Sequence, residues 1–197
     1  MTSDLLTMDL QKKWDQRYRH ASLSAPNAAF VLHDNRHLLP DKGDALDLAC
    51  GLGGNALLLA EAGLRTQAWD LSPVAIEALQ FRAVEAQYDL QATVRNMSTS
   101  PPLPESFDVI VVSYFLDRSL VKSLCAALRP EGLLYYQTFV RDKVSQQGPN
   151  NPEYLLAENE LLSLFSELCP RVYREEGQLG EVQHGLRNEA LLVAQKR

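Results

Sequence analysis

The sequence predicts an α/β fold with a doubly wound, seven-stranded and mostly parallel sheet that ends in a C-terminal antiparallel hairpin. An apolar run over residues 45–50 leads into a glycine cluster and then into a helical pattern. Residues 107–113 are rich in β-branched side chains and lack polar alternation, which is typical of a central strand covered on both faces. Residues 172–176 and 189–194 indicate two strands without a helix between them, so we expect them to pair antiparallel.

Strands and helices alternate between these landmarks. Further strands are predicted over residues 65–70, 90–95 and 133–140, and helices over residues 54–62, from 73 onward, over 118–128 and over 158–168. Gly63 is placed to cap the first helix, while Ser72 and Pro73 suit the N-cap and the first position of the second. The Arg129-Pro130-Glu131-Gly132 segment is expected to end the third helix.

Residues 1–43 precede the first strand and are expected to form an N-terminal helical arm, with the main domain over residues 44–197. Trp14 and Tyr18 share one face of this amphipathic arm because they are four residues apart. The arm has two interpretations. It packs on the main domain, or it forms a lid that places its aromatic rings against apolar or cationic parts of a ligand.

Composition and charge narrow the class of protein. The formal net charge of −6 and the lack of a basic run argue against a surface that follows a nucleic acid backbone. No stretch is long and apolar enough to predict a membrane span, and the N-terminal residues lack the layout of a secretion signal. Three scattered cysteines fit buried thiols in a reducing cytoplasm, and no Cys/His spacing suggests a metal site. We therefore expect a cytoplasmic protein that acts on a small molecule, and the sequence does not define its oligomeric state.

The glycine cluster and the acid after it predict a nucleoside site. Gly51 and Gly53 let the main chain approach a ligand closely, and the N–H groups of the following helix then face that ligand. Asp70 ends the next strand, where a carboxylate can accept hydrogen bonds from both hydroxyls of a ribose. In a doubly wound sheet the ligand lies beyond the carboxyl ends of the strands, where these residues meet.

Four segments resemble the motifs of the class I S-adenosylmethionine-dependent methyltransferases. They are Leu46 to Asn55, Trp69 to Ser72, Phe107 to Ile110 and Leu128 to Gly132. Within the class, Lys13 to Tyr18 and the Asn55-Ala56 pair are similar to the tellurite-resistance and thiopurine methyltransferase branch. The resemblance implies a Rossmann-like methyltransferase fold, S-adenosyl-L-methionine as cofactor, and an arm that covers it.

The resemblance also implies the residues that bind the cofactor. They are Trp14, Arg17, Tyr18, Gly51, Gly53, Asp70, Leu71, Asn96, Met97, Ser113 and Tyr114. The glycines would receive the amino-acid end, Asp70 the ribose, and Leu71 the adenine, while Arg17 would pair with the cofactor carboxylate. Asn96 stands where the family often has Asp, and its amide oxygen can accept the same bond without the charge.

The implied chemistry is an in-line displacement from a sulfonium, so the protein chiefly aligns the acceptor and excludes water. A general base is needed only if the attacking atom carries a proton, and the sequence identifies no catalytic residue. Candidate substrate residues follow the fourth and fifth strands: Tyr114, Asp117, Arg118, Phe139 and Arg141. Asp117 and Arg118 have the alternative interpretation of a helix start and a solvated charge. His20 and His184 are the histidines best placed to reach the pocket from the arm and the hairpin.

Two rival functions stay open. The Gly51-x-Gly53-x-x-Ala56 pattern followed by Asp70 also fits an NAD(P)-dependent oxidoreductase, although the long N-terminal segment and the closing hairpin argue against it. A non-catalytic S-adenosylmethionine-binding protein is the other, because no base is identified. The leading hypothesis is a methyltransferase whose acceptor is a small molecule such as a thiol or a chalcogen oxyanion.

Overall fold

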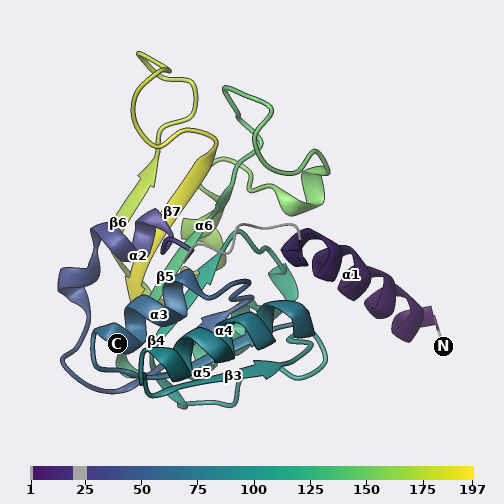
Figure 1. Ribbon diagram of the computed structural model, residues 1–197. Coiled ribbons are helices and arrows are strands. Elements are labelled where there is room, and N and C mark those ends of the chain that lie inside the picture. Colours follow the sequence, from purple (N-terminus) through teal and green to yellow (C-terminus); the bar gives the residue numbers. More distant parts are fainter. Residues whose placement is uncertain (1, 20–25) are drawn as a thin grey trace.

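The computed structural model describes residues 2–19 and 26–197, which form a seven-stranded sheet with helices on both faces (Figure 1). The strands are β1 (Asp44–Leu48), β2 (Arg65–Asp70), β3 (Leu90–Val94), β4 (Phe107–Ser113), β5 (Leu128–Phe139), β6 (Cys169–Glu175) and β7 (Glu189–Gln195). Their order across the sheet is β3-β2-β1-β4-β5-β7-β6. The first five strands in this order are mutually parallel, and β7 runs antiparallel to both β5 and β6. The predicted fold class and closing hairpin are confirmed.

The described helices are α1 (Thr2–Arg19), α2 (Phe30–Asp34), α3 (Gly54–Glu61), α4 (Pro73–Glu85), α5 (Val121–Ala127) and α6 (Glu160–Leu164). Three single 3₁₀ turns lie at Arg36–Leu38, Arg118–Leu120 and Pro152–Tyr154. The predicted helix starts hold at α4, where Ser72 Oγ accepts a hydrogen bond from the Ala75 N–H at 3.3 Å and Pro73 takes the first helical position. None of these helices is long and apolar enough to cross a bilayer.

Consecutive residues of the central strands enter opposite apolar layers, as the twofold period of a strand requires. Ile110 of β4 belongs to the buried layer that contains Leu124 of α5 and Leu161 of α6. Its neighbour Val109 belongs to the other layer, with Leu59 of α3. Both faces of the central strands are therefore buried, which explains the continuous apolar run that the sequence shows over β4.

Two predicted boundaries are wrong. The strand predicted over residues 133–140 begins earlier, because β5 starts at Leu128 and includes the Arg129–Gly132 segment. The pairing with β4 jumps from Leu128 to Leu133 between Phe107 and Val109, so the segment is an irregularity inside the strand. Glu131, with φ 65°, donates its N–H to the Lys196 carbonyl at 2.8 Å, a contact between segments far apart in sequence.

The helix predicted over residues 158–168 is also shorter than expected, because α6 covers only Glu160–Leu164. Asn159 has a left-handed φ of 58°, and Phe165 leaves the helical region with φ −106° and ψ 32°. Leu168 still turns back through its N–H to the Phe165 carbonyl and is buried. Burial of these apolar residues in irregular turns therefore reproduces the spacing of a longer helix.

Candidate cofactor-binding site

The glycine loop between β1 and α3 contains three residues with left-handed φ: Ala49, Gly51 and Gly53. Gly51 and Gly53 have φ of 52° and 88°, which favour glycine. A Cβ at Gly53 would also overlap the side chain of Leu79 on α4. The Gly53 N–H donates to the Cys50 carbonyl at 2.9 Å, and α3 starts at the next residue. Both glycines are buried, and Tyr18 and Leu79 lie where their side chains would be, so the loop brings closely packed main chain to the carboxyl end of β1.

Asp70 lies at the end of β2 and holds this loop. Its carboxylate accepts the Gly51 N–H at 2.8 Å and the Ser72 N–H at 2.9 Å, and the residue is 6 % exposed. Burial raises the pKa of Asp70, and the backbone donors act against that shift because they favour the charged form. A carboxylate has about four acceptor positions, so Asp70 keeps capacity for further donors such as sugar hydroxyls.

A second buried acid, Asp47 inside β1, orders the start of α3. Its carboxylate accepts the Ala56 N–H at 3.0 Å and the Asn55 side-chain amide at 3.3 Å. Asn55 also accepts the Ala29 N–H at 2.8 Å and donates to Ser113 Oγ at 2.8 Å. Asn55 therefore ties the glycine loop to the end of β4. Complete burial raises the pKa of Asp47 to about 7, against the opposing effect of its two donors.

The arm α1 reaches this loop through Tyr18 and Asp15. A Cβ on Gly51 would lie 2.9 Å from the Tyr18 hydroxyl, so no larger side chain fits between them. Burial and the nearby charge of Asp70 raise the pKa of Tyr18. The buried Asp15 accepts a hydrogen bond from Ser72 Oγ at the start of α4. Figure 1 shows α1 at the side of the molecule, with its C-terminal end toward the sheet.

The other arm residues that were predicted to bind the cofactor stack on one another. The Trp14 and Tyr18 rings lie 5.8 Å apart and nearly parallel, and the Arg17 guanidinium lies 5.6 Å from the centre of the Trp14 ring. Arg17 is exposed, whereas Trp14 and Tyr18 are half-buried. The structure thus brings Tyr18 close to Gly51 and Asp70. Trp14 stacks on Tyr18, and Arg17 lies over the Trp14 ring.

The residues predicted around the adenine occupy the ends of β2 and β3. Leu71 is half-buried directly after Asp70. Asn96 accepts the Ser98 N–H at 3.1 Å through its amide oxygen and donates to Thr7 of the arm at 3.5 Å. Met97 is buried in the apolar layer that contains Trp69, so it packs inside the protein rather than at the surface of the site.

The substrate candidates after β4 have structural partners. Asp117 accepts the Ser119 N–H at 3.0 Å and Ser98 Oγ at 2.8 Å, which caps the turn that follows. Arg118 binds Glu160 through two hydrogen bonds of 2.6 and 2.9 Å and donates to the Leu155 carbonyl at 3.1 Å. These contacts give both side chains a structural task, and their assignment as substrate residues stays a prediction. The alternative interpretation of Asp117 as a helix start is the one that the contacts support.

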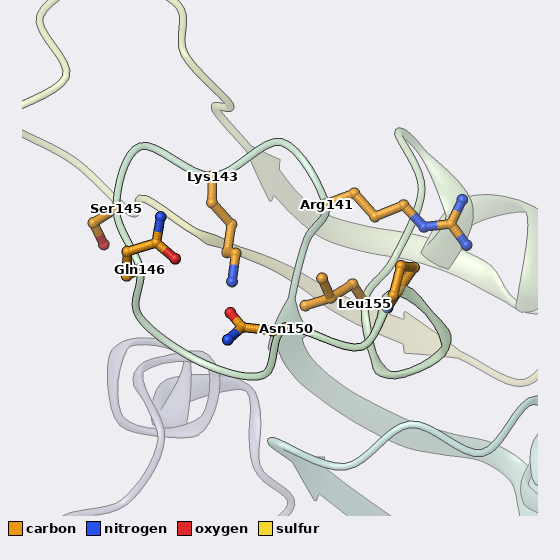
Figure 2. Close-up of a pocket in the computed structure, with 7 residues that line it drawn as sticks. Arg141, Lys143, Ser145, Gln146, Asn150 and Leu155 are labelled. Carbon is orange, nitrogen blue, oxygen red and sulfur yellow. The ribbon is translucent and has the colours of Figure 1, made fainter.

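Phe139 and Arg141, the candidates after β5, lie apart from each other. The Phe139 ring lies 5.3 Å from the Tyr114 ring, beside the end of β4. Arg141 lines a cavity of about 420 Å³ within the loop over residues 141–155, together with Lys143 and Asn150. Figure 2 shows the Lys143 and Asn150 side chains turned toward each other, while the Arg141 guanidinium points away from them.

Of the two histidines expected near the pocket, only His184 lies in the part of the chain that the structure describes. His184 lies in the loop between β6 and β7, its side chain is 77 % exposed, and its ring nitrogen is 3.4 Å from a carboxylate oxygen of Glu181. His20 lies outside the described residues.

Comparison with known proteins identifies the domain. Residues 45–132 match a family model described as a methyltransferase domain. Residues 45–132 therefore resemble a methyltransferase domain. It is 29 % identical over 122 residues to the putative methyltransferase YqeM of Bacillus subtilis, a match that takes in 57 % of this chain and 49 % of that protein. The chain thus spans about half the length of this curated relative.

Solved structures share the fold of the methyltransferase domain. TehB from Haemophilus influenzae superposes with a TM-score of 0.71 at 20 % identity, covering 93 % of this chain and 67 % of that one. The geranyl diphosphate C-methyltransferase of Streptomyces coelicolor superposes with a TM-score of 0.66 at 17 % identity, covering 84 % and 75 %. That structure contains S-adenosyl-L-homocysteine. These likenesses show the class I methyltransferase fold.

The residues present in the methyltransferase domain fit S-adenosyl-L-methionine. The main chain of the glycine loop, the carboxylate of Asp70 with unused acceptor positions, and the apolar Leu71 beside it are of the chemistry that suits an amino-acid end, a ribose and a base. A sulfonium is positively charged, and the buried carboxyl groups of Asp47 and Asp70 lie at this end of the sheet.

Four residues around this site were not predicted from the sequence: Asp15, Asp47, Gln137 and Glu189. A carboxylate inside the apolar run of β1 and another at the start of the apolar β7 were the available signals. Both are unusual, because buried charges are rare unless they are paired or hydrogen-bonded.

Proposed function

We propose that this chain transfers a methyl group from S-adenosyl-L-methionine to a small-molecule acceptor such as a thiol, a chalcogen oxyanion or a similar group. The observation that carries the proposal is the buried carboxylate of Asp70, fixed by Gly51 and Ser72 beside the glycine loop of a methyltransferase domain. When bound, S-adenosylmethionine supplies a methyl group that is already activated by its positive sulfur. The residues of the chain then bind, orient and exclude water.

Five of the predicted cofactor residues have a proposed task. Asp70 accepts the ribose hydroxyls, the main chain at Gly51 and Gly53 receives the amino-acid end, and Leu71 packs on the adenine. Tyr18 of the arm closes the loop side of the pocket, which its contact with Gly51 supports. The shared fold with TehB supports the narrower likeness to the tellurite-resistance branch. The three free cysteines support a reducing, cytoplasmic setting.

The strand order favours this proposal over an oxidoreductase. Dinucleotide-binding sheets commonly run 3-2-1-4-5-6 with all strands parallel. Here an antiparallel β7 lies between β5 and β6. Asp70 would also suit the ribose of NAD, but the order and direction of the strands around it favour a methyltransferase.

Two measurements test the proposal. Thermal unfolding is followed with S-adenosylhomocysteine or NADH, since a ligand at 100 times its dissociation constant stabilises by about 2.7 kcal/mol. Stabilisation by S-adenosylhomocysteine alone is expected, and stabilisation by NADH alone would reject the proposal. Transfer of labelled methyl groups is then measured against thiols, selenite, tellurite and small acids. Tight cofactor binding with no transfer to any of them would indicate a non-catalytic binding protein instead.

A further inference from the structure

A buried acid lies at the edge of the sheet where β7 begins. Glu189 opens β7 and is 6 % exposed. Among the residues that the structure describes, no Lys, Arg or His pairs with it. Its partners are the Gln137 side-chain amide and the Tyr114 hydroxyl. Because an unpaired buried charge is costly, this arrangement needs an explanation.

Gln137 of β5 fixes the direction of these hydrogen bonds. Its amide oxygen accepts the Val31 N–H at 2.6 Å, so its nitrogen must face the other way. That nitrogen donates to Glu189 and, at 3.3 Å, to the Tyr114 hydroxyl. A primary amide nitrogen only donates, so the Glu189 oxygen that it meets carries no proton. The Tyr114 hydroxyl accepts from Gln137 and donates its own proton to Glu189.

Tyr114 connects this pair with the cofactor site. It directly follows Ser113, which accepts from Asn55 at the start of α3, and it has a left-handed φ of 55°. Its N–H donates to the Gln137 carbonyl at 2.8 Å, which holds the turn. The residue is 47 % exposed and lines, with Gly54, an open hollow of about 1150 Å³. Its oxygen keeps one acceptor position free for a proton from outside.

We propose that Tyr114 and Glu189 form a proton relay for an acceptor whose attacking atom carries a proton, such as a thiol or a hydroxyl. The inference rests on the proposed function. Tyr114 meets the acceptor and is the catalytic residue, whereas Glu189 and Gln137 act through it and are positioning residues. An anionic oxygen acceptor would not need the relay, so the pair narrows the substrate class to protonated nucleophiles.

The step balances as follows for an acceptor X–H. The acceptor proton passes to the Tyr114 oxygen while the Tyr114 proton passes to the Glu189 carboxylate, which becomes a neutral acid. The X–H electron pair stays on X and forms the bond to the methyl carbon. The carbon–sulfur bond breaks with its electron pair left on sulfur, so the positive charge lost there matches the negative charge lost at Glu189. Burial raises the pKa of Glu189, which improves it as a proton acceptor near neutral pH.

The first test needs no ligand. Burial and Glu189 together raise the pKa of Tyr114 to about 12. The ring of Tyr114 is titrated by NMR with ¹³C-labelled tyrosine, its signal being assigned with Tyr114→Phe. In Glu189→Gln the pKa of Tyr114 should fall by about one unit, because the neighbouring negative charge is gone. Glu158→Gln, an exposed acid before α6, is the control and should leave it unchanged. An unchanged Tyr114 pKa in Glu189→Gln overturns the proposal.

The second test uses two probes that differ in one proton. Ethanethiol carries a proton on its attacking sulfur, and dimethyl sulfide does not. Methyl transfer to ethanethiol should fall roughly 10²- to 10⁴-fold in Glu189→Gln and lose its dependence on pH, whereas transfer to dimethyl sulfide should not change. Equal loss with both probes, or no transfer to ethanethiol by the wild type, overturns the relay. Calorimetry with S-adenosylhomocysteine on the same proteins separates failure of the relay from failure of the proposed function. If the proposed function is wrong, the wild type does not bind S-adenosylhomocysteine.

Discussion

Asp70 combines two tasks in one side chain. Its carboxylate shapes the loop by accepting Gly51 and Ser72 N–H groups, and its unused acceptor positions are proposed to bind the ribose. The two tasks reinforce each other, because a carboxylate already fixed by the backbone loses little freedom when a ligand arrives. The same residue therefore sets both the geometry and the affinity of the site.

Replacing Asp70 separates these tasks. Asp70→Ala should weaken S-adenosylhomocysteine binding by about 1.5–3 kcal/mol, the range for hydrogen bonds to a charged group. Isothermal titration calorimetry measures this, with circular dichroism to confirm that the fold is retained. Glu77→Ala, an exposed acid on α4, is the matched control and should bind like the wild type. Unchanged affinity in a folded Asp70→Ala protein would remove Asp70 from the site.

Asp47 predicts a pH dependence of stability. Burial raises its pKa from about 3.8, the value expected in the unfolded chain, to about 7 in the folded protein. Between these values the folded state holds a proton that the unfolded state has lost. The free energy of unfolding should therefore fall as pH rises from about 4 to about 7, by at most about 1.4 kcal/mol per unit, and level off above.

The contribution of Asp47 is isolated by substitution. Asp47→Asn keeps an oxygen for the Ala56 N–H but does not titrate, so its free energy of unfolding should vary less with pH than that of the wild type. Urea denaturation at several values between pH 4.5 and 8 measures the difference between the two proteins. A constant difference across this range would show that Asp47 does not titrate there.

The arm α1 is held by few contacts for its length. It contacts α4, and Asp15 accepts from Ser72 Oγ, the same hydroxyl that caps α4. Tyr18 lies against Gly51, but most of the described arm side chains are exposed. Segments with few buried contacts open at low free energy, so the arm is suited to admit and cover a ligand.

Weakening the Asp15 contact should loosen the arm. In Asp15→Ala, backbone amides of residues 7–19 should exchange with deuterium about 5- to 30-fold faster, which corresponds to the loss of a buried hydrogen bond worth about 1–2 kcal/mol. Hydrogen exchange with mass spectrometry measures this in the full chain. Asp9→Ala, an exposed acid on the same helix, should not change the rates. Equal effects of the two substitutions would mean that Asp15 does not anchor the arm.

Long-range contacts across the molecule hold the loops above the sheet. Arg118 lies just after β4, yet its guanidinium binds Glu160 of α6 and the carbonyls of Glu153 and Leu155. One side chain thus joins the end of a central strand to the loop that precedes α6. Such a multiply bonded arginine is worth more than an isolated surface ion pair.

Arg118→Ala should therefore lower the free energy of unfolding by about 1–3 kcal/mol, since it removes the side-chain donor of the Leu155 carbonyl and leaves the Glu160 carboxylate with the Ala157 N–H but no positive partner. Arg65→Ala is the control, because Arg65 makes an ion pair with Asp44 while its side chain is 69 % exposed, and it should cost less than about 1 kcal/mol. Urea denaturation compares the two. Equal costs would show that the Arg118 contacts are no stronger than a surface pair.

The sequence by itself determined the order of strands and helices, the closing hairpin and the glycine loop with its acid. Each of these follows from local periodicity or from a turn that only glycine allows, so neighbouring residues specify it. Local periodicity does not specify the ends of the elements, because buried irregular turns around Phe165 and Leu168 repeat the spacing of a helix.

Only the tertiary structure decided which side chains meet. Glu189 and Tyr114 are far apart in sequence, and they come together because β7 inserts antiparallel beside β5. From the sequence, Arg118 could be a free charge that binds a ligand. In the folded protein it forms an ion pair with Glu160, which is distant in sequence. A local pattern reports the period of an element, whereas partners across a sheet depend on strand order and register, which no short stretch of sequence contains.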